Sequence, residues 1–213
     1  MNTTFMLSGG AGRIICAIPA LEKYHRLNPE DDFKVLVAGW DMLFYSNPIL
    51  QNRTYEINQK GNFENHIKNN KLIVPEPYYD YKFYNQQSHL IESFDEIINN
   101  TTDHSDLKFS NYLYLSTAEK GYAKQNIKYY KEYKQKNKVV VFQPFGSSVE
   151  LIYNETVDQT NRSLSRKNYL KIVKTISEHA AVVYMGPQTF RLPEDDISIY
   201  LNDDQYYLSL IHI

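Results

Sequence analysis

The sequence predicts an α/β protein with mostly parallel sheets, and three observations support this prediction. Residues 5–8 (FMLS) form a short apolar run that ends at the glycine-rich turn of residues 9–12. Strand-like and helix-like segments then alternate along the first half of the chain, as they do in sheets covered by helices. The same order restarts near Asn137, because residues 138–143 (KVVVFQ) form the clearest buried strand of the chain. The restart predicts a second α/β unit.

Apolar spacing predicts the elements of the first half in order. After the glycine-rich turn, Ile14, Ile18 and Leu21 recur at i, i+4 and i+7, which is the pattern of a buried helix face. Pro19 lies inside this helix and is expected to kink it or to loosen one turn. The other expected elements are strands at 33–38, 54–57 and 71–74, a short helix at 41–46, an aromatic loop at 75–81, a helix at 86–99, a strand at 112–115 and a helix at 117–135.

The second half reads as strand, loop, helix and strand. Residues 144–148 (PFGSS) form a polar glycine turn after the first strand. Ser165 is expected to cap the helix that follows, since a serine at this position accepts a hydrogen bond from the first turn. A strand at 180–185 then ends at Gly186, and the pattern stops after about 70 residues, short of a complete doubly wound sheet. The expected domains are residues 1–136 and 137–207.

The sequence of the last six residues, 208–213 (LSLIHI), suggests a foreign origin. This peptide is what CTG-TCT-CTT-ATA-CAC-ATC would encode, and that nucleotide sequence resembles a transposon-end adapter used for sequencing libraries. We expect a non-native tail here and a natural protein that continues beyond Tyr207. A native strand or helix start is the alternative interpretation.

Composition argues against several classes of protein. The formal charge of −2 and the pI of about 6.3 give no electrostatic case for nucleic-acid binding. Cys16 is the only cysteine, so an internal disulfide is impossible, and the six histidines show no metal-binding spacing. No apolar run approaches 18 residues and no signal peptide begins the chain. We expect a cytoplasmic protein without a transmembrane segment, metal or cofactor.

The turn at residues 9–12 is a candidate phosphate site. Glycines allow positive φ angles and close approach of a ligand, and the following helix start offers free N–H groups. A Walker loop would need a Lys-Ser or Lys-Thr pair after Gly12, and a dinucleotide fingerprint would need a small residue where Ile15 stands. The sequence therefore predicts neither ATP nor NAD binding by these motifs. The alternative is a turn that only connects strand to helix.

Taken in order, these landmarks resemble glycosyltransferase family 9, the lipopolysaccharide heptosyltransferase-like enzymes. Residues 12–21 resemble the family's opening G-D-x-x-x-x-x-P-x-L motif. The other matching segments are Pro29 with 33–37 (the P…VLV strand), Asn47-Pro48 (the NP turn), 139–147 (the strand and PG turn), 162–165 (the Lys-x-Trp-Pro position) and 182–187 (the vvllGgp strand). The motifs are short, and they occur in the family's order over most of residues 5–207.

The resemblance implies two facing Rossmann-like domains of the GT-B type, the second incomplete, with the active site in the cleft. It implies metal-independent transfer of a sugar from a nucleotide-diphosphate sugar donor to a glycan acceptor. The first domain would face the acceptor and the second would bind the donor. The residues that it places at the site are Gly9, Gly10 and Gly12 in the cleft loop, Arg13 at the catalytic position, and Ser147, Arg162, Ser163, Gly186 and Gln188 around the donor.

Two departures from the family pattern affect the chemistry. The residue after Gly12 is usually Asp, the proposed base, whereas Arg13 cannot accept a proton. Asp41 and Glu76 are the nearest carboxylates that could replace it. The later family segment D-S-G-p-m-H-l-a does not occur in the chain, so we expect this fragment to be inactive.

Sugar transfer from a nucleotide diphosphate develops negative charge on the leaving group, which cations and helix N-termini stabilise when no metal is bound. Arg13 and Arg162 both stand beside predicted helix starts. An arginine at the positive end of a helix is unfavourable unless an anion lies nearby. We therefore expect Arg13 and the glycine-rich turn to face the cleft, and tyrosines of residues 75–84 to stack on sugar rings or simply to pack. A non-catalytic nucleotide- or glycan-binding relative and another phosphate-ligand α/β enzyme are the alternatives.

Overall fold

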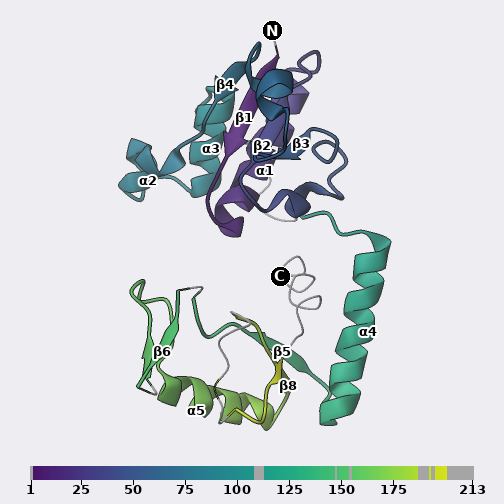
Figure 1. Ribbon diagram of the computed structural model, residues 1–213, viewed down its shortest axis with the longest axis vertical. Helices are drawn as coiled ribbons and strands as arrows, with labels where there is room; N and C mark the ends of the chain where they lie inside the picture. Colours follow the sequence, from purple (N-terminus) through teal and green to yellow (C-terminus); the bar gives the residue numbers. More distant parts are fainter. Residues whose placement is uncertain are drawn as a thin grey trace. The chain divides into compact units, whose positions relative to one another are not determined.

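The computed structural model describes residues 2–107, 113–146, 148–153, 155–186, 192 and 195–200. Contacts divide the chain into two compact units, Met1–Tyr114 and Leu115–Ile213 (Figure 1). Both units are α/β units that contain a parallel sheet, as the alternating pattern of the sequence predicts.

The sheet of the first unit has four parallel strands in the order β3-β2-β1-β4. Phe5 of β1 is level with Val35 of β2 on one side and with Ile73 of β4 on the other. β1 and β2 are almost wholly buried because helices and neighbouring strands cover them, which explains their apolar sequences. The strands are β1 Thr3–Leu7, β2 Lys34–Val37, β3 Thr54–Glu56 and β4 Lys71–Ile73, which confirms the four strands predicted in this region.

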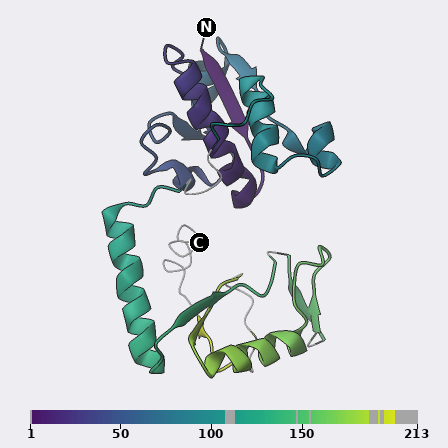
Figure 2. The same ribbon diagram turned by 180° about the vertical axis from the view of Figure 1, so that it is seen from behind.

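Two helices pack against each other and against this sheet. α1 (Ala11–Leu27) buries Ile14, Ile18 and Leu21 in the core, as their spacing predicts, and remains helical on both sides of Pro19. α3 (Leu90–Asn99) contacts α1, and Figure 2 shows both helices in front of the sheet. α3 begins at Leu90 and not at residue 86, because His89 and Glu92 form a capping box at its start.

Short helical elements lie between the longer ones: η1 Asp41–Phe44 and η2 Phe63–Ile67 connect strands, and η3 Pro77–Tyr79 and α2 Tyr81–Tyr84 lie between β4 and α3. The helix expected at 41–46 is thus a single 3₁₀ turn. The strand expected at 112–115 is wrong for its described part, since residues 113–115 lie outside any strand. Leu113 packs against the core of the first unit instead of pairing in a sheet.

The sheet of the second unit is parallel, with the order β5-β8-β9, and a helix covers each face. Tyr169 of α5 packs with Val182 on one face, and Tyr130 of α4 packs with Val183 on the other. These two valines are adjacent in β8, so their side chains point to opposite faces. The elements are α4 Thr117–Lys134, β5 Val139–Phe142, α5 Arg166–Ser177, β8 Ala181–Tyr184 and β9 Ile199–Tyr200. The first four confirm the helices and strands predicted here, whereas the sequence did not predict β9.

An antiparallel hairpin, β6 (Glu150–Ile152) with β7 (Glu155–Val157), occupies the segment that the sequence predicts as a loop. Its two strands have three residues each, too few to show an alternation of polar and apolar side chains. The Thr156 hydroxyl accepts from the Arg166 N–H at 3.1 Å and donates to the Leu164 carbonyl at 3.0 Å, which joins the hairpin to the start of α5. Ser165 caps α5 as predicted, since its side chain accepts from the Asn168 N–H.

The contact division falls after Tyr114, whereas the sequence pattern restarts at Asn137. α4 lies between these positions and packs on the sheet of the second unit through Tyr130. The proposed tail at 208–213 lies outside the described residues. Within the described part of the chain, the helices are all too short or too polar for a membrane-spanning segment.

Candidate functional site

The first unit has a candidate site at the carboxyl edge of its sheet. The chain passes from β1 to β2 on one side of β1 and later returns to β4 on the other side. The strand order therefore reverses between β1 and β4, which is where open α/β sheets bind their ligands. The glycine-rich turn follows β1 at this point, and residues 75–78 follow β4.

The glycine-rich turn is open to solvent. Gly9, Gly10 and Gly12 are exposed, and a Cβ atom added at Gly10 or Gly12 would meet no other atom within 4 Å. Gly9 has a φ of 105°, a value that side chains rarely tolerate. No side chain caps the start of α1, so backbone N–H groups there can donate to an anion.

Arg13 connects the loops that follow β1 and β4. Its Nη2 atom donates to the Pro75 carbonyl at 2.9 Å and pairs with Glu76 Oε1 at 2.8 Å. Its guanidinium carbon also lies 5.1 Å from the ring centre of Tyr78. The Arg13 side chain is 11% exposed, and its buried Nε has no hydrogen-bond partner among the described residues. The carboxylate of Glu76 is thus an anion beside the helix start, which offsets the unfavourable position of Arg13.

The packing of Arg13 also explains why residue 9 is glycine. A Cβ atom at Gly9 would lie 3.0 Å from Cδ of Arg13, closer than ordinary van der Waals contact. The two carboxylates considered as bases are placed differently. Glu76 lies at Arg13, whereas Asp41 accepts a hydrogen bond from the Tyr45 hydroxyl at 2.8 Å.

The aromatic loop after β4 carries exposed tyrosines on η3 and α2. Tyr79, Tyr81 and Tyr84 are 86%, 74% and 79% exposed, so these rings do not serve the core. Asp80 fixes the start of α2 by accepting from the Phe83 N–H at 2.8 Å. These rings follow Tyr78, against which Arg13 lies, and provide flat apolar surfaces that a sugar ring can cover.

In the second unit, Asp158 organises the loop that follows β5. Its carboxylate accepts from the Ser163 hydroxyl at 2.6 Å and from the Ser148 hydroxyl at 3.0 Å. It also accepts from the Thr160 hydroxyl at 2.6 Å and from the Thr160 N–H at 2.8 Å. These donors, Ser163 first, hold the pKa of Asp158 far below its usual range.

Ser163 links Asp158 to the backbone of the glycine turn at Gly146. Its hydroxyl oxygen accepts from the Gly146 N–H at 2.8 Å while its proton goes to Asp158. A Cβ atom at Gly146 would lie 3.0 Å from Asp158 Oδ2, so a larger residue would crowd this contact. Arg162 is exposed, and its Nε donates to the Thr160 hydroxyl at 3.1 Å. The structure thus brings Gly146, Arg162 and Ser163 together around Asp158, a residue that the sequence motifs did not identify.

The other residues implied as donor-binding are placed less directly. Gly186 is buried, and a Cβ atom there would lie 2.7 Å from Cζ of Tyr184, so its lack of a side chain serves packing. Ser147 and Gln188 lie outside the described residues. Within the described part of the chain, no group of three or more His, Cys, Asp or Glu side chains could hold a metal ion.

Asp158→Ala is expected to release the loop at Gly146 without unfolding the unit. We expect hydrogen exchange of the Gly146 and Thr160 amides to accelerate by at least tenfold, because both lose the acceptor that fixes them, directly or through Ser163. Mass spectrometry of exchanged peptides checks this. Glu155→Ala, which removes an exposed carboxylate from the neighbouring hairpin, is the control. Unchanged exchange in Asp158→Ala would contradict the role given to Asp158.

No protein-family model and no curated protein matches the sequence. The structure is similar to that of the ADP-heptose LPS heptosyltransferase II of E. coli, with a TM-score of 0.56. The similarity covers 99% of this chain and 76% of that chain, at 12% sequence identity. At this identity the likeness shows the fold alone. The protein therefore shares its α/β fold with that heptosyltransferase, in agreement with the order of motifs in its sequence.

Proposed function

We propose that the protein is a glycosyltransferase of the GT-B type, which moves a sugar from a nucleotide-diphosphate sugar to a glycan acceptor. The structural likeness to a heptosyltransferase over 99% of the chain is the observation that carries this proposal. The open glycine-rich turn at the β1–β4 reversal supports it, because that turn offers an anion site where α/β sheets bind ligands.

In this proposal the second unit holds the donor. The loop fixed by Asp158 presents the exposed Arg162 beside Ser163. Ser147, Gly186 and Gln188 are the other residues that the proposal assigns to the donor. The guanidinium of Arg162 would pair with the diphosphate and stabilise the charge that develops as the sugar leaves. The first unit would face the acceptor, with the exposed tyrosines of η3 and α2 as stacking surfaces.

A second candidate is a nucleotide- or glycan-binding relative that does not catalyse transfer. It is favoured by Arg13, which stands where a carboxylate base is expected and is itself paired with Glu76. Arg13 can neutralise an anion but cannot take a proton from an acceptor hydroxyl. Binding without hydrolysis or transfer would support this candidate.

A thermal-shift panel tests the proposed function. ADP, GDP, UDP and CDP are compared with NAD and ATP, each at a concentration well above its dissociation constant. We expect one nucleoside diphosphate to raise the melting temperature, since a ligand at about 100 times its dissociation constant stabilises by about 2.7 kcal/mol. Stabilisation by NAD or ATP alone would indicate a different enzyme class.

Variants of the second unit assign the stabilisation to the proposed donor site. Arg162→Ala is expected to weaken nucleoside-diphosphate binding by about tenfold or more, because a charge-assisted hydrogen bond to phosphate is worth about 1.5–3 kcal/mol. Lys167→Ala removes an exposed cation from the same region, at the start of α5, and should leave binding unchanged. Equal binding by wild type and Arg162→Ala would remove Arg162 from the site.

A further inference from the structure

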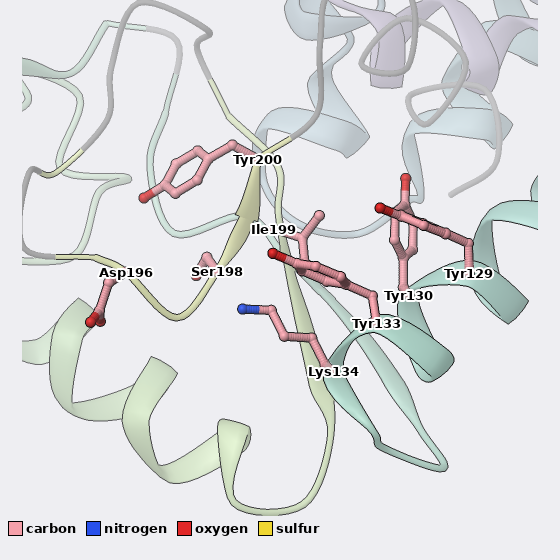
Figure 3. Close-up of a pocket in the computed structure, with 8 residues that line it drawn as sticks. All are labelled: Tyr129, Tyr130, Tyr133, Lys134, Asp196, Ser198, Ile199 and Tyr200. Carbon is pink, nitrogen blue, oxygen red and sulfur yellow. The ribbon is translucent and has the colours of Figure 1, made fainter.

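A cavity of about 410 Å³ lies between the end of α4 and strand β9 in the second unit (Figure 3). Tyr129 and Tyr133 of α4 are 57% and 62% exposed, although the neighbouring Tyr130 is buried against the sheet. The cavity is lined by Tyr129, Tyr130, Tyr133, Lys134, Asp196, Ser198, Ile199 and Tyr200.

This cavity is separate from the loop that we assign to the donor. Lys134 ends α4 and lies only five positions before Val139, where β5 begins. Asp196 and Ser198 precede β9, whose Ile199 is level with Val183 of β8. The cavity therefore adjoins the beginning of the strands on the face covered by α4, whereas Gly146 and Asp158 lie beyond the end of β5.

The aromatic wall of the cavity has a defined geometry. The rings of Tyr129 and Tyr133 are nearly parallel, with an angle of 12° and centres 5.9 Å apart. Lys134 Nζ lies 5.4 Å from the centre of the Tyr133 ring. Figure 3 shows Tyr133 and Lys134 extending from α4 toward β9, where Ser198 and Ile199 lie. A ligand would meet an aromatic surface and a cation from one side.

The charged groups of the cavity are available to a ligand. Lys134 and Asp196 contribute opposite charges, and neither has a hydrogen bond or ion pair within the described part of the chain. An anionic ligand would be attracted by Lys134 and repelled by Asp196, and a cationic ligand the reverse. A neutral ligand with several hydroxyl groups satisfies both, because hydroxyls donate to a carboxylate and accept from an ammonium group.

We propose that this cavity binds a carbohydrate, with the C–H face of a sugar against Tyr133 and Tyr129 and its hydroxyls on Asp196 and Lys134. The volume lies in the usual range for small-ligand sites, which combine aromatic walls with a few convergent polar groups. The cavity's lining residues are different from those that we assign to the donor and the acceptor of the proposed transfer reaction. It would hold a neutral sugar unit of a glycan on the second unit.

Saturation-transfer NMR with methyl glycosides of glucose, galactose, mannose and N-acetylglucosamine tests this proposal. We expect the ring protons of at least one glycoside to receive saturation from the wild-type protein. Tyr133→Ala should weaken that binding at least fivefold, and Asp196→Asn should weaken it as well. Tyr133→Phe keeps the ring and should bind nearly as wild type. Tyr153→Ala removes a tyrosine that is 98% exposed elsewhere in the unit and serves as the matched control.

Three outcomes would overturn the carbohydrate site: no saturation of any glycoside at millimolar concentration, equal binding by wild type and Tyr133→Ala, or binding of adenosine without any glycoside. A melting curve of each variant confirms its fold, which the exposure of Tyr133 is expected to preserve. Nucleoside-diphosphate binding is measured in parallel. It should be weakened in Arg162→Ala and unchanged in Tyr133→Ala, so the failure of one site is distinguishable from the failure of the other.

Discussion

Replacing Lys23 by methionine is expected to lower the free energy of unfolding of the first unit by about 3–5 kcal/mol, the usual cost of leaving a buried charge without its partner. The side chains of Lys23 and Asp95 are 6% and 0% exposed, and Nζ lies 2.9 Å from Oδ2. Methionine fills the space of lysine but, among the described residues, leaves the Asp95 carboxylate with His104 and Asn99 as its side-chain donors.

The measurement is a urea titration followed by tryptophan fluorescence. Trp40 is the only tryptophan of the chain and packs against the core of the first unit, so it reports that unit alone. Arg26→Met is the matched control, because it removes a cation from the same helix whose pair with Asp106 is 49% exposed on both sides. Arg26→Met should lower the free energy of unfolding by less than about 1 kcal/mol. If Lys23→Met lowered the free energy of unfolding by less than about 1 kcal/mol, the buried pair would not be important for stability.

The same pair predicts a loss of stability at alkaline pH. Burial alone would lower the pKa of Lys23, but hydrogen bonds to Asp95 and Asp106 outweigh it and raise the pKa above the ordinary value. A raised pKa in the folded state contributes stability that is complete below the unfolded-state pKa of about 10.4 and is lost as pH rises through the folded value. Urea titrations from pH 8 to 11 should show this decline in wild type and a weaker one in Lys23→Met.

Local signals in the sequence predicted much of the fold. The run at residues 5–8, the glycines and the spacing of Ile14, Ile18 and Leu21 each depend on neighbours within a few positions, and β1 and α1 appear where these signals place them. Ser165 likewise acts on Asn168, three positions away. Strand, turn and helix could be predicted because their causes are close in sequence.

The parts that sequence could not supply depend on distant partners. Arg13 and Glu76 are about 60 positions apart, and Lys23 and Asp95 are 72 positions apart. No local sequence pattern could therefore predict either pair. Asp158 has a weak local signal, since it accepts from Thr160 two positions later. The hydrogen bond from Ser163 to Asp158 gains a role only because Ser163 also accepts from the Gly146 N–H, and Gly146 is distant from both in the sequence.

Arg13→Ala and Glu76→Gln are expected to change nucleoside-diphosphate affinity in opposite directions. If Arg13 contacts the diphosphate, Glu76 competes with the ligand for the same guanidinium, since Nη2 lies 2.8 Å from Oε1. Arg13→Ala should then weaken binding by about 10–100-fold, the value of a charge-assisted bond. Glu76 is 38% exposed, so the pair that Glu76→Gln removes is worth about 1 kcal/mol or less, and affinity should rise up to about fivefold.

Opposite changes in affinity in the two variants would distinguish a ligand-binding role of Arg13 from a structural role. Arg13 also holds the Pro75 carbonyl and lies against Tyr78, so Arg13→Ala alone could act by loosening the loop after β4. A loosened loop would also follow from Glu76→Gln, and both variants would then bind more weakly. Isothermal titration with the stabilising nucleoside diphosphate distinguishes the two, with Arg26→Ala at the other end of α1 as the charge control. If neither variant changes the affinity, Arg13 does not contact the diphosphate, and Arg162 remains the candidate for the phosphate contact.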